Sequence, residues 1–119
     1  MKFSELDLKP QILESLKNMG FEDLTPIQNN TFHIILGGKD LISLAETGSG
    51  KTAAASIPIV QRVDPNKNAV QALVVVPTRE LALQYVSEIG DIGRKTNVSP
   101  FAVYGGVDIN IQKAKLNHG

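Results

Sequence analysis

The segment from Ala45 to Thr52, Ala-Glu-Thr-Gly-Ser-Gly-Lys-Thr, has the residue types and the spacing of a phosphate-binding loop. Gly48 and Gly50 permit backbone conformations that point several N–H groups at one anion. Lys51 would bring a positive charge to the terminal phosphates, and the Thr52 hydroxyl is placed to ligate Mg²⁺. We therefore predict a site for a nucleoside triphosphate and Mg²⁺, in which Lys51 and Thr52 are catalytic and Thr52 is the metal ligand.

The chain around this segment has the elements that a phosphate loop needs. Residues 41–44 form a short apolar run that predicts a buried strand, and residues 51–63 predict a helix that opens with three alanines. A strand, a glycine-rich turn and a helix in this order are the required context. The alternative is a merely flexible turn. The predicted nucleotide-binding residues of the loop are Ala45, Glu46, Thr47, Gly48, Ser49, Gly50, Lys51 and Thr52.

Strands and helices alternate along the rest of the chain. Apolar spacing predicts helices near residues 10–19, 25–36, 81–92 and 109–116, and Pro58 should kink or end the first part of the helix after the loop. Residues 72–76 and 101–104 predict two more strands, and the first of them is typical of a strand covered on both faces. The expected fold class is α/β, with a parallel sheet and helices on both faces.

Composition limits the function further. The chain has 119 residues, no cysteine, and 12 basic against 12 acidic residues, so its formal net charge is zero. We expect one domain at most, in a reducing cytoplasmic setting and without a membrane span. A neutral chain cannot hold nucleic acid by bulk electrostatics, so such binding needs placed contacts. His33 and His118 have no partners at ligand spacing, and we expect no metal site at either.

Three further features narrow the function. They are residues 20–28 (Gly-Phe-Glu-Asp-Leu-Thr-Pro-Ile-Gln), residues 77–82 (Pro-Thr-Arg-Glu-Leu-Ala) and the pair Gly105-Gly106. With the phosphate loop and in this order, they resemble the Q motif, motif Ia and the Gly-Gly turn of DEAD-box ATP-dependent RNA helicases. The resemblance implies a RecA-like P-loop domain that uses ATP and Mg²⁺. Residues 1–119 would be the N-terminal portion of the helicase ATP-binding domain, with the Q motif in 1–29 and the loop in 45–52.

The resemblance assigns adenine recognition to the Q motif. Gln28 would donate to and accept from the adenine edge, Thr25 would support it, and Phe21 would stack on the base with the assistance of Phe3. There are structural alternatives. Thr25 and Gln28 also form the pattern of a helix capping box, and Phe21 could simply pack in the core.

The resemblance assigns RNA-backbone contacts to the other two features. Thr78 and the first-turn amides of the following helix would donate to phosphate, and Arg79 would add charge or an internal ion pair. The alternatives are that Glu80 only favours the helix dipole, that Arg79 is solvated, and that the glycines form only a tight turn. Little sequence specificity is expected. The predicted RNA-binding residues are Pro77, Thr78, Arg79, Glu80, Gly105 and Gly106.

The chain also departs from the family pattern. The Asp-Glu-Ala-Asp motif, the Ser-Ala-Thr motif and the second domain with its arginine finger do not occur in these 119 residues. We therefore expect the chain alone to bind nucleotide without appreciable hydrolysis or unwinding. The unpaired sheet edges should favour self-association. A stand-alone binding module and a P-loop enzyme of another kind, such as a small-molecule kinase, are the rival hypotheses.

Overall fold

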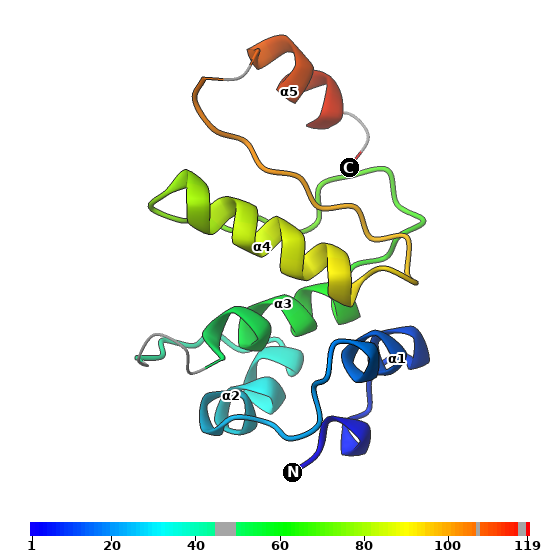
Figure 1. The fold of residues 1–119 in the computed structure, drawn as a ribbon. Coiled ribbons are helices and arrows are strands. Elements are labelled where there is room, and N and C mark those ends of the chain that lie inside the picture. The colour runs from blue at the N-terminus through cyan, green and yellow to red at the C-terminus, as the bar shows by residue number, and fades with distance from the viewer. Residues whose placement is uncertain (45–49, 107, 117–118) are drawn as a thin grey trace.

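The computed structural model describes residues 1–44, 50–106, 108–116 and 119 of the chain. A short 3₁₀ turn, η1, precedes a group of four helices, and a fifth helix lies apart from them at the end of a long extended stretch of chain (Figure 1). The elements are η1 (Phe3–Glu5), α1 (Pro10–Asn18), α2 (Pro26–Leu36), α3 (Lys51–Arg62), α4 (Arg79–Ile92) and α5 (Ile109–Leu116). All of the predicted helices are confirmed.

Local signals account for the ends of the first two helices. α1 begins with Pro10, whose missing N–H costs nothing in the first turn, and it is followed by Gly20 at a φ of 83°. α2 begins after Thr25, whose side chain accepts a hydrogen bond from the backbone N–H of Gln28. It ends at Gly37. These are the start and stop signals that the sequence carries.

α3 runs through Pro58 without interruption. It begins at Lys51, directly after Gly50, and continues four residues beyond the proline to Arg62. The prediction that Pro58 ends the first part of this helix is therefore wrong. Pro58 and the adjoining Ile57 are fully buried. Packing of this face against the neighbouring helices offsets the backbone hydrogen bond that a proline cannot donate.

The core of the described residues is made by helices. α3 packs against α2 on one side and α4 on the other, and α1 contacts both α3 and α4. Phe3 of η1 is buried and stacks on Phe21, with 5.7 Å between the ring centroids. The buried apolar residues are Phe3, Leu8, Ile12, Leu16, Phe32, Ala53, Ala54, Ile57, Val60, Ile89 and Ile92.

The three predicted strands are not strands in the described structure. Residues 41–44, 72–76 and 101–104 are irregular, and among the described residues no backbone hydrogen bond joins one of these segments to another. The parallel sheet is therefore not confirmed. Leu73 and Val75 are each 84% exposed, so the expectation that 72–76 is covered on both faces is wrong.

The reason is that a strand depends on a paired neighbour, whereas a helix satisfies its own backbone. The segment 72–76 still shows the alternation of a strand, because Val74 is far less exposed than Leu73 and Val75 on either side of it. The whole segment lines the cavity beside α3 and α4, with Leu73 and Val75 more open to solvent than Val74. The apolar run predicted a strand covered on both faces, and neither that coverage nor the pairing is present in the described structure.

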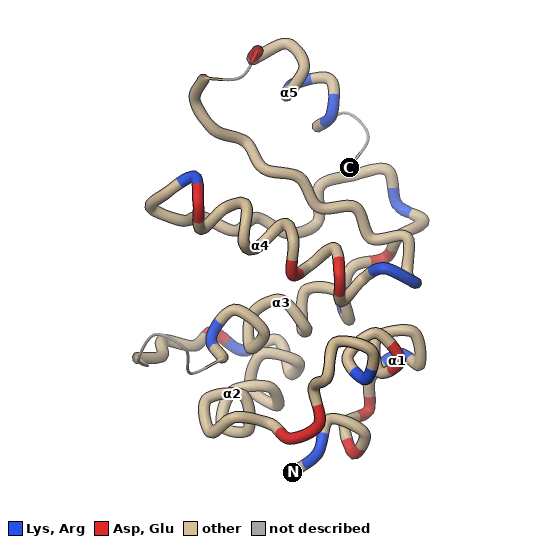
Figure 2. The backbone as a smooth tube through the Cα atoms, in the orientation of Figure 1, with Lys and Arg blue, Asp and Glu red and all other residues tan. Residues whose placement is uncertain are grey.

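Lys and Arg positions do not cluster in one part of the described backbone (Figure 2). Lys and Arg positions (blue) and Asp and Glu positions (red) are both spread along the tube. Binding of a polyanion would therefore depend on individual contacts. No helix among the described residues is long and apolar enough to cross a membrane.

Candidate nucleotide and RNA sites

Gln28 joins the start of α2 to the end of the phosphate loop. Its Oε1 accepts the backbone N–H of Thr25 at 3.0 Å, and its backbone N–H donates to the Thr25 hydroxyl at 3.4 Å. The capping box is thus confirmed. In addition, Nε2 of Gln28 donates to the carbonyl oxygen of Gly50 at 3.3 Å. The side chain is buried, so these contacts fix the amide against the residue that precedes α3.

Gly50 occupies a place that no other residue type fits. Its φ is 92°, in the left-handed region that favours glycine. A Cβ added there would lie 2.6 Å from Nε2 of Gln28 and 2.7 Å from Oγ1 of Thr25. The close approach of the loop to the Q motif therefore depends on the missing side chain. The glycine of the loop serves tertiary packing as well as backbone conformation.

The start of α3 has the form of an anion site. An α-helix leaves its first N–H groups without intrahelical acceptors and carries partial positive charge at this end. Thr25 caps α2 with its side chain, whereas Gly50 has no side chain to cap α3. Lys51 is exposed and Thr52 is partly buried in the first turn. The predicted residues Ala45, Glu46, Thr47, Gly48 and Ser49 lie outside the described residues.

Phe21 is partly exposed, with one face against the buried Phe3. Phe3 also approaches Phe32 of α2, with 6.1 Å between the ring centroids. Phe3 is therefore a core residue. Phe21 lies at the margin of that core, so the core-packing alternative and the predicted stacking on a base are both compatible with its position.

The segment 77–80 is exposed at the start of α4. The Thr78 hydroxyl accepts the backbone N–H of Leu81 at 3.1 Å and so caps the helix. A hydroxyl that accepts one bond still has its own proton to donate. Glu80 lies in the first turn, where its charge favours the helix dipole. Pro77 precedes the cap and is exposed as well.

Arg79 connects this segment to the Gly-Gly turn. Its Nη2 donates to the carbonyl oxygen of Gly105 at 2.7 Å, and its guanidinium carbon lies 4.7 Å from the centroid of the Tyr104 ring. Gly105 and Gly106 are exposed, and Gly106 has a φ of 88°. The structure thus brings together the two segments that the sequence assigned to RNA. It gives Arg79 a hydrogen bond and a cation–π contact; an internal ion pair for it is not among the described salt bridges.

Gln112 was not predicted from the sequence. This side chain of α5 accepts the backbone N–H of Tyr104 through Oε1 at 2.9 Å and donates to the carbonyl oxygen of Tyr104 through Nε2 at 3.3 Å. It is the one buried residue of α5. Its sequence signal was weak, because a polar residue in a short helix is normally exposed to solvent. The helix also contains Ile109 and Ile111, so an apolar inner face was the simpler expectation, but both isoleucines are exposed.

One carboxyl group has a shifted pKa. Burial in α4 raises the pKa of Glu88 above its usual value, and the nearby negative charge of Asp91 raises it further. Glu88 lies within α4, away from the helix start that carries the predicted RNA contacts. Among the described residues, no group of three or more His, Cys, Asp or Glu side chains could hold a metal ion.

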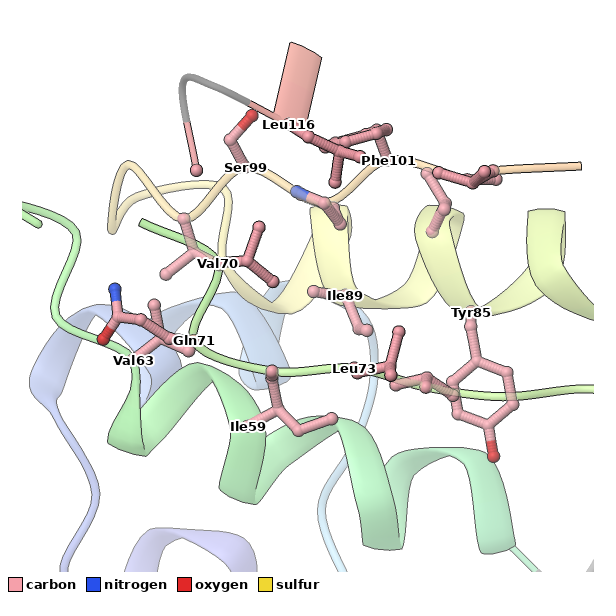
Figure 3. Close-up of a pocket in the computed structure, with 18 of the residues that line it drawn as sticks. Ile59, Val63, Val70, Gln71, Leu73, Tyr85, Ile89, Ser99, Phe101 and Leu116 are labelled. Carbon is pink, nitrogen blue, oxygen red and sulfur yellow. The ribbon is translucent and has the colours of Figure 1, made fainter. Parts of the chain in front are cut away.

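An apolar cavity lies elsewhere among the described residues. It has a volume of about 460 Å³ and lies between α3, α4 and the extended segments near residues 70–76 and 97–103 (Figure 3). Its lining is mostly apolar and includes Ile59, Val70, Leu73, Tyr85, Ile89 and Phe101. None of the described nucleotide-binding residues lines it. This space belongs to the incomplete packing of the extended segments rather than to a polar ligand site.

RNA helicases are among the known proteins to which this chain is similar in sequence. The chain is 46% identical over 116 residues to the ATP-dependent RNA helicase CshA of Limosilactobacillus reuteri, and 49% identical over 115 residues to CshA of Listeria monocytogenes. These alignments cover 98% and 97% of this chain but 23% and 22% of the relatives. The chain therefore spans less than a quarter of the length of these relatives.

Solved structures agree. A DEAD box protein from Methanococcus jannaschii superimposes with a TM-score of 0.94 at 37% identity, over 99% of this chain and 32% of that one. A hypothetical ATP-dependent RNA helicase from Sulfolobus tokodaii superimposes with a TM-score of 0.81 at 38% identity, over 93% of this chain and 32% of that one. These likenesses support the RecA-like fold. The profile of DEAD/DEAH box helicases matches residues 25–119, and this chain belongs to that family.

Proposed function

We propose that this chain binds ATP with Mg²⁺ and the backbone of single-stranded RNA, as the N-terminal part of the ATP-binding domain of an RNA helicase. In a complete enzyme these contacts would couple ATP hydrolysis to the unwinding of RNA duplexes. One observation carries the proposal. The Gln28 side chain touches Gly50, so the residue assigned to the base lies against the start of the helix assigned to the phosphates.

Gln28 has capacity left for a base. A glutamine amide has two donor hydrogens and an oxygen with two lone pairs, and its contacts to Gly50 and Thr25 use one of each. The remaining donor and acceptor would match the N7 and N6 positions of adenine. Guanine has an acceptor where adenine has a donor, so it would be rejected. Phe21 would stack on the same base from the margin of the core.

The residues at the start of α3 fit Mg²⁺–ATP. Gly50 provides the close backbone approach, Lys51 is exposed in the first turn, and Thr52 supplies a hydroxyl beside it. Thr52 would be the protein ligand of Mg²⁺, and Lys51 would contact the terminal phosphates. When bound, the metal ion would neutralise charge on the phosphate oxygens. Ala45 to Ser49 complete the proposed loop.

The exposed surface formed by residues 77–80 and 105–106 would bind RNA phosphates. Thr78 and the first-turn amides of α4 are the proposed donors, while Arg79 holds the Gly105 carbonyl and adds positive charge. Contacts of this kind do not read bases. We therefore expect weak sequence preference and affinity that falls as salt concentration rises.

The proposed fold of the longer enzyme contains a parallel sheet. Residues 41–44, 72–76 and 101–104 would be strands of that sheet, paired through segments that correspond to the remainder of the relatives. In the 119-residue chain their exposed apolar side chains would instead favour self-association. Hydrolysis and unwinding by these residues alone are not expected.

A thermal-shift measurement tests the nucleotide site. At about 100 times its dissociation constant, Mg²⁺–ATP should raise the free energy of unfolding by about 2.7 kcal/mol, which shows as a higher melting temperature. Mg²⁺–GTP at the same concentration should give a much smaller shift. Equal shifts for the two nucleotides would contradict the adenine role of Gln28. If neither nucleotide shifts the melting temperature, the proposed nucleotide site is wrong.

A chimera tests the helicase role. Residues 1–119 would replace the matching segment of the Listeria monocytogenes CshA relative, and RNA-stimulated ATP hydrolysis and unwinding of a short duplex would be measured. We expect the chimera to be active and the 119-residue chain alone to be inactive. A folded chimera that binds ATP and RNA without turnover would favour the stand-alone binding module.

A further inference from the structure

We propose that Gln112 is a positioning residue for the RNA contact, acting on the Gly105-Gly106 turn through the backbone of Tyr104. The inference rests on the proposed RNA binding and adds a residue that none of the recognised motifs contains. It is carried by the two hydrogen bonds that the Gln112 amide makes with the N–H and the C=O of Tyr104.

The turn is held from two sides. Gln112 of α5 fixes the peptide groups on either side of the Tyr104 Cα, and Arg79 of α4 donates to the carbonyl of Gly105, the next residue. The Tyr104 ring lies under the Arg79 guanidinium. A Cβ at Gly106 would lie 3.0 Å from Nη2 of Arg79, so the second glycine also approaches this group closely. Backbone direction at the two glycines is thus set by two side chains from different helices.

Burial supports a specific role for Gln112. A buried amide is costly unless it is hydrogen-bonded, and this one is buried in a helix whose apolar residues Ile109, Ile111 and Leu116 are exposed. α5 is therefore attached to the turn through this polar pair. Exposed glycines are otherwise free to sample many conformations. Restricting them before RNA arrives lowers the conformational cost of binding.

The chain offers a matched control. Gln71 makes the same kind of pair with one backbone residue, accepting the Asp64 N–H at 3.0 Å and donating to the Asp64 carbonyl at 2.7 Å. It is exposed, and its partner residue belongs to the turn-rich segment after α3 rather than to the RNA surface. Gln71→Met and Gln112→Met each remove one such pair with little change in side-chain volume.

The experiment measures the affinity of each variant for a short fluorescein-labelled oligouridylate by anisotropy, together with the ATP-induced shift in melting temperature. Gln112→Met should bind RNA about tenfold more weakly, as expected for the loss of hydrogen bonds that pre-order the turn. Its ATP-induced shift should match that of the parent chain. Gln71→Met should bind RNA as the parent does. Equal RNA affinity of Gln112→Met and the parent would overturn the inference.

A second variant separates positioning from general loss of stability. A protonated glutamic acid can both accept from the N–H and donate to the C=O of Tyr104, whereas a carboxylate can only accept. The RNA affinity of Gln112→Glu should therefore recover relative to the parent as pH falls from about 7 to about 4, through the ordinary pKa of glutamate. No relative recovery would overturn the positioning role. Failure of the parent chain to bind RNA at all would instead overturn the proposed RNA binding.

Discussion

Nε2 of Gln28 lies 3.3 Å from the carbonyl oxygen of Gly50, a residue 22 positions further along the chain. Through this contact the cap of α2 and the start of α3 share one side chain. A change on either side of the contact should therefore disturb both helix packing and nucleotide binding.

Gly50→Ala should destabilise the protein. The added Cβ would overlap Gln28 and Thr25, and the φ of 92° is unfavourable for alanine. A strained backbone of this kind costs about 1–3 kcal/mol in the free energy of unfolding, and affinity for ATP should fall with it. Chemical denaturation and the ATP-induced thermal shift would measure the two effects. Gly90→Ala, inside α4 where a Cβ meets nothing within 4 Å, should instead stabilise by about 0.5–1 kcal/mol. Similar losses for both would contradict the steric account.

Lys51→Ala should weaken ATP binding. Removing one charge-assisted contact to phosphate costs about 1.5–3 kcal/mol, which corresponds to a roughly ten- to hundredfold increase in the dissociation constant. Calorimetric titration with Mg²⁺–ATP would measure it. Lys67→Ala removes an exposed lysine from the turn-rich segment after α3 and serves as the control. If both variants bind as the parent does, the nucleotide does not occupy the start of α3.

Thr78→Ala should affect both stability and RNA affinity. Loss of the hydroxyl that accepts from Leu81 should cost about 0.5–2 kcal/mol in the free energy of unfolding, because an N-cap is lost. Weaker RNA binding should accompany it. Thr78→Ser keeps the hydroxyl and should restore both properties. A variant that loses stability but keeps full RNA affinity would show that Thr78 is only a cap.

Glu88 predicts a dependence of stability on pH. The pKa of Glu88 is raised in the folded state above its ordinary value of 4.5. Between the unfolded and the folded pKa, the folded protein therefore holds more protons than the unfolded chain. The stabilisation that comes from protonated Glu88 is therefore fully present at low pH, and it is lost as pH rises through the folded pKa. Glu88→Gln should therefore gain stability over the parent as pH increases across this window. Denaturation of both proteins at several pH values would measure it, with Glu22→Gln, at an exposed position outside the helices, as the control for loss of one negative charge. A constant difference between Glu88→Gln and the parent would contradict the assignment.

The exposed face of residues 72–76 predicts association between copies. Leu73 and Val75 each present an apolar side chain to solvent. Sedimentation velocity should show a concentration-dependent increase in mass for the parent chain. Leu73→Lys combined with Val75→Lys should reduce this increase with little change in the melting temperature, because neither side chain is buried. A parent chain that remains monomeric at high concentration would refute the prediction.

Helices and caps were predictable because their signals are local. Pro10 and Thr25 mark helix starts in the sequence, and the structure has α1 beginning at Pro10 and α2 directly after Thr25. The strands could not be predicted in the same way, because strand pairing depends on neighbouring segments elsewhere in the chain. Gly50 was predicted to serve the phosphate loop, but its packing against Gln28 is a tertiary contact between distant residues. Gln112 and the stacking of Arg79 on Tyr104 escaped detection for the same reason.

The way α5 is attached has a consequence for how its loosening could be observed. Most of its apolar side chains already face water, so detaching the helix would expose little additional apolar surface. Such an opening would leave the heat capacity and the denaturant dependence of the protein almost unchanged. Amide hydrogen exchange would report it directly, through early exchange of the Tyr104 amide together with those of α5, while the amides of α3 remained protected.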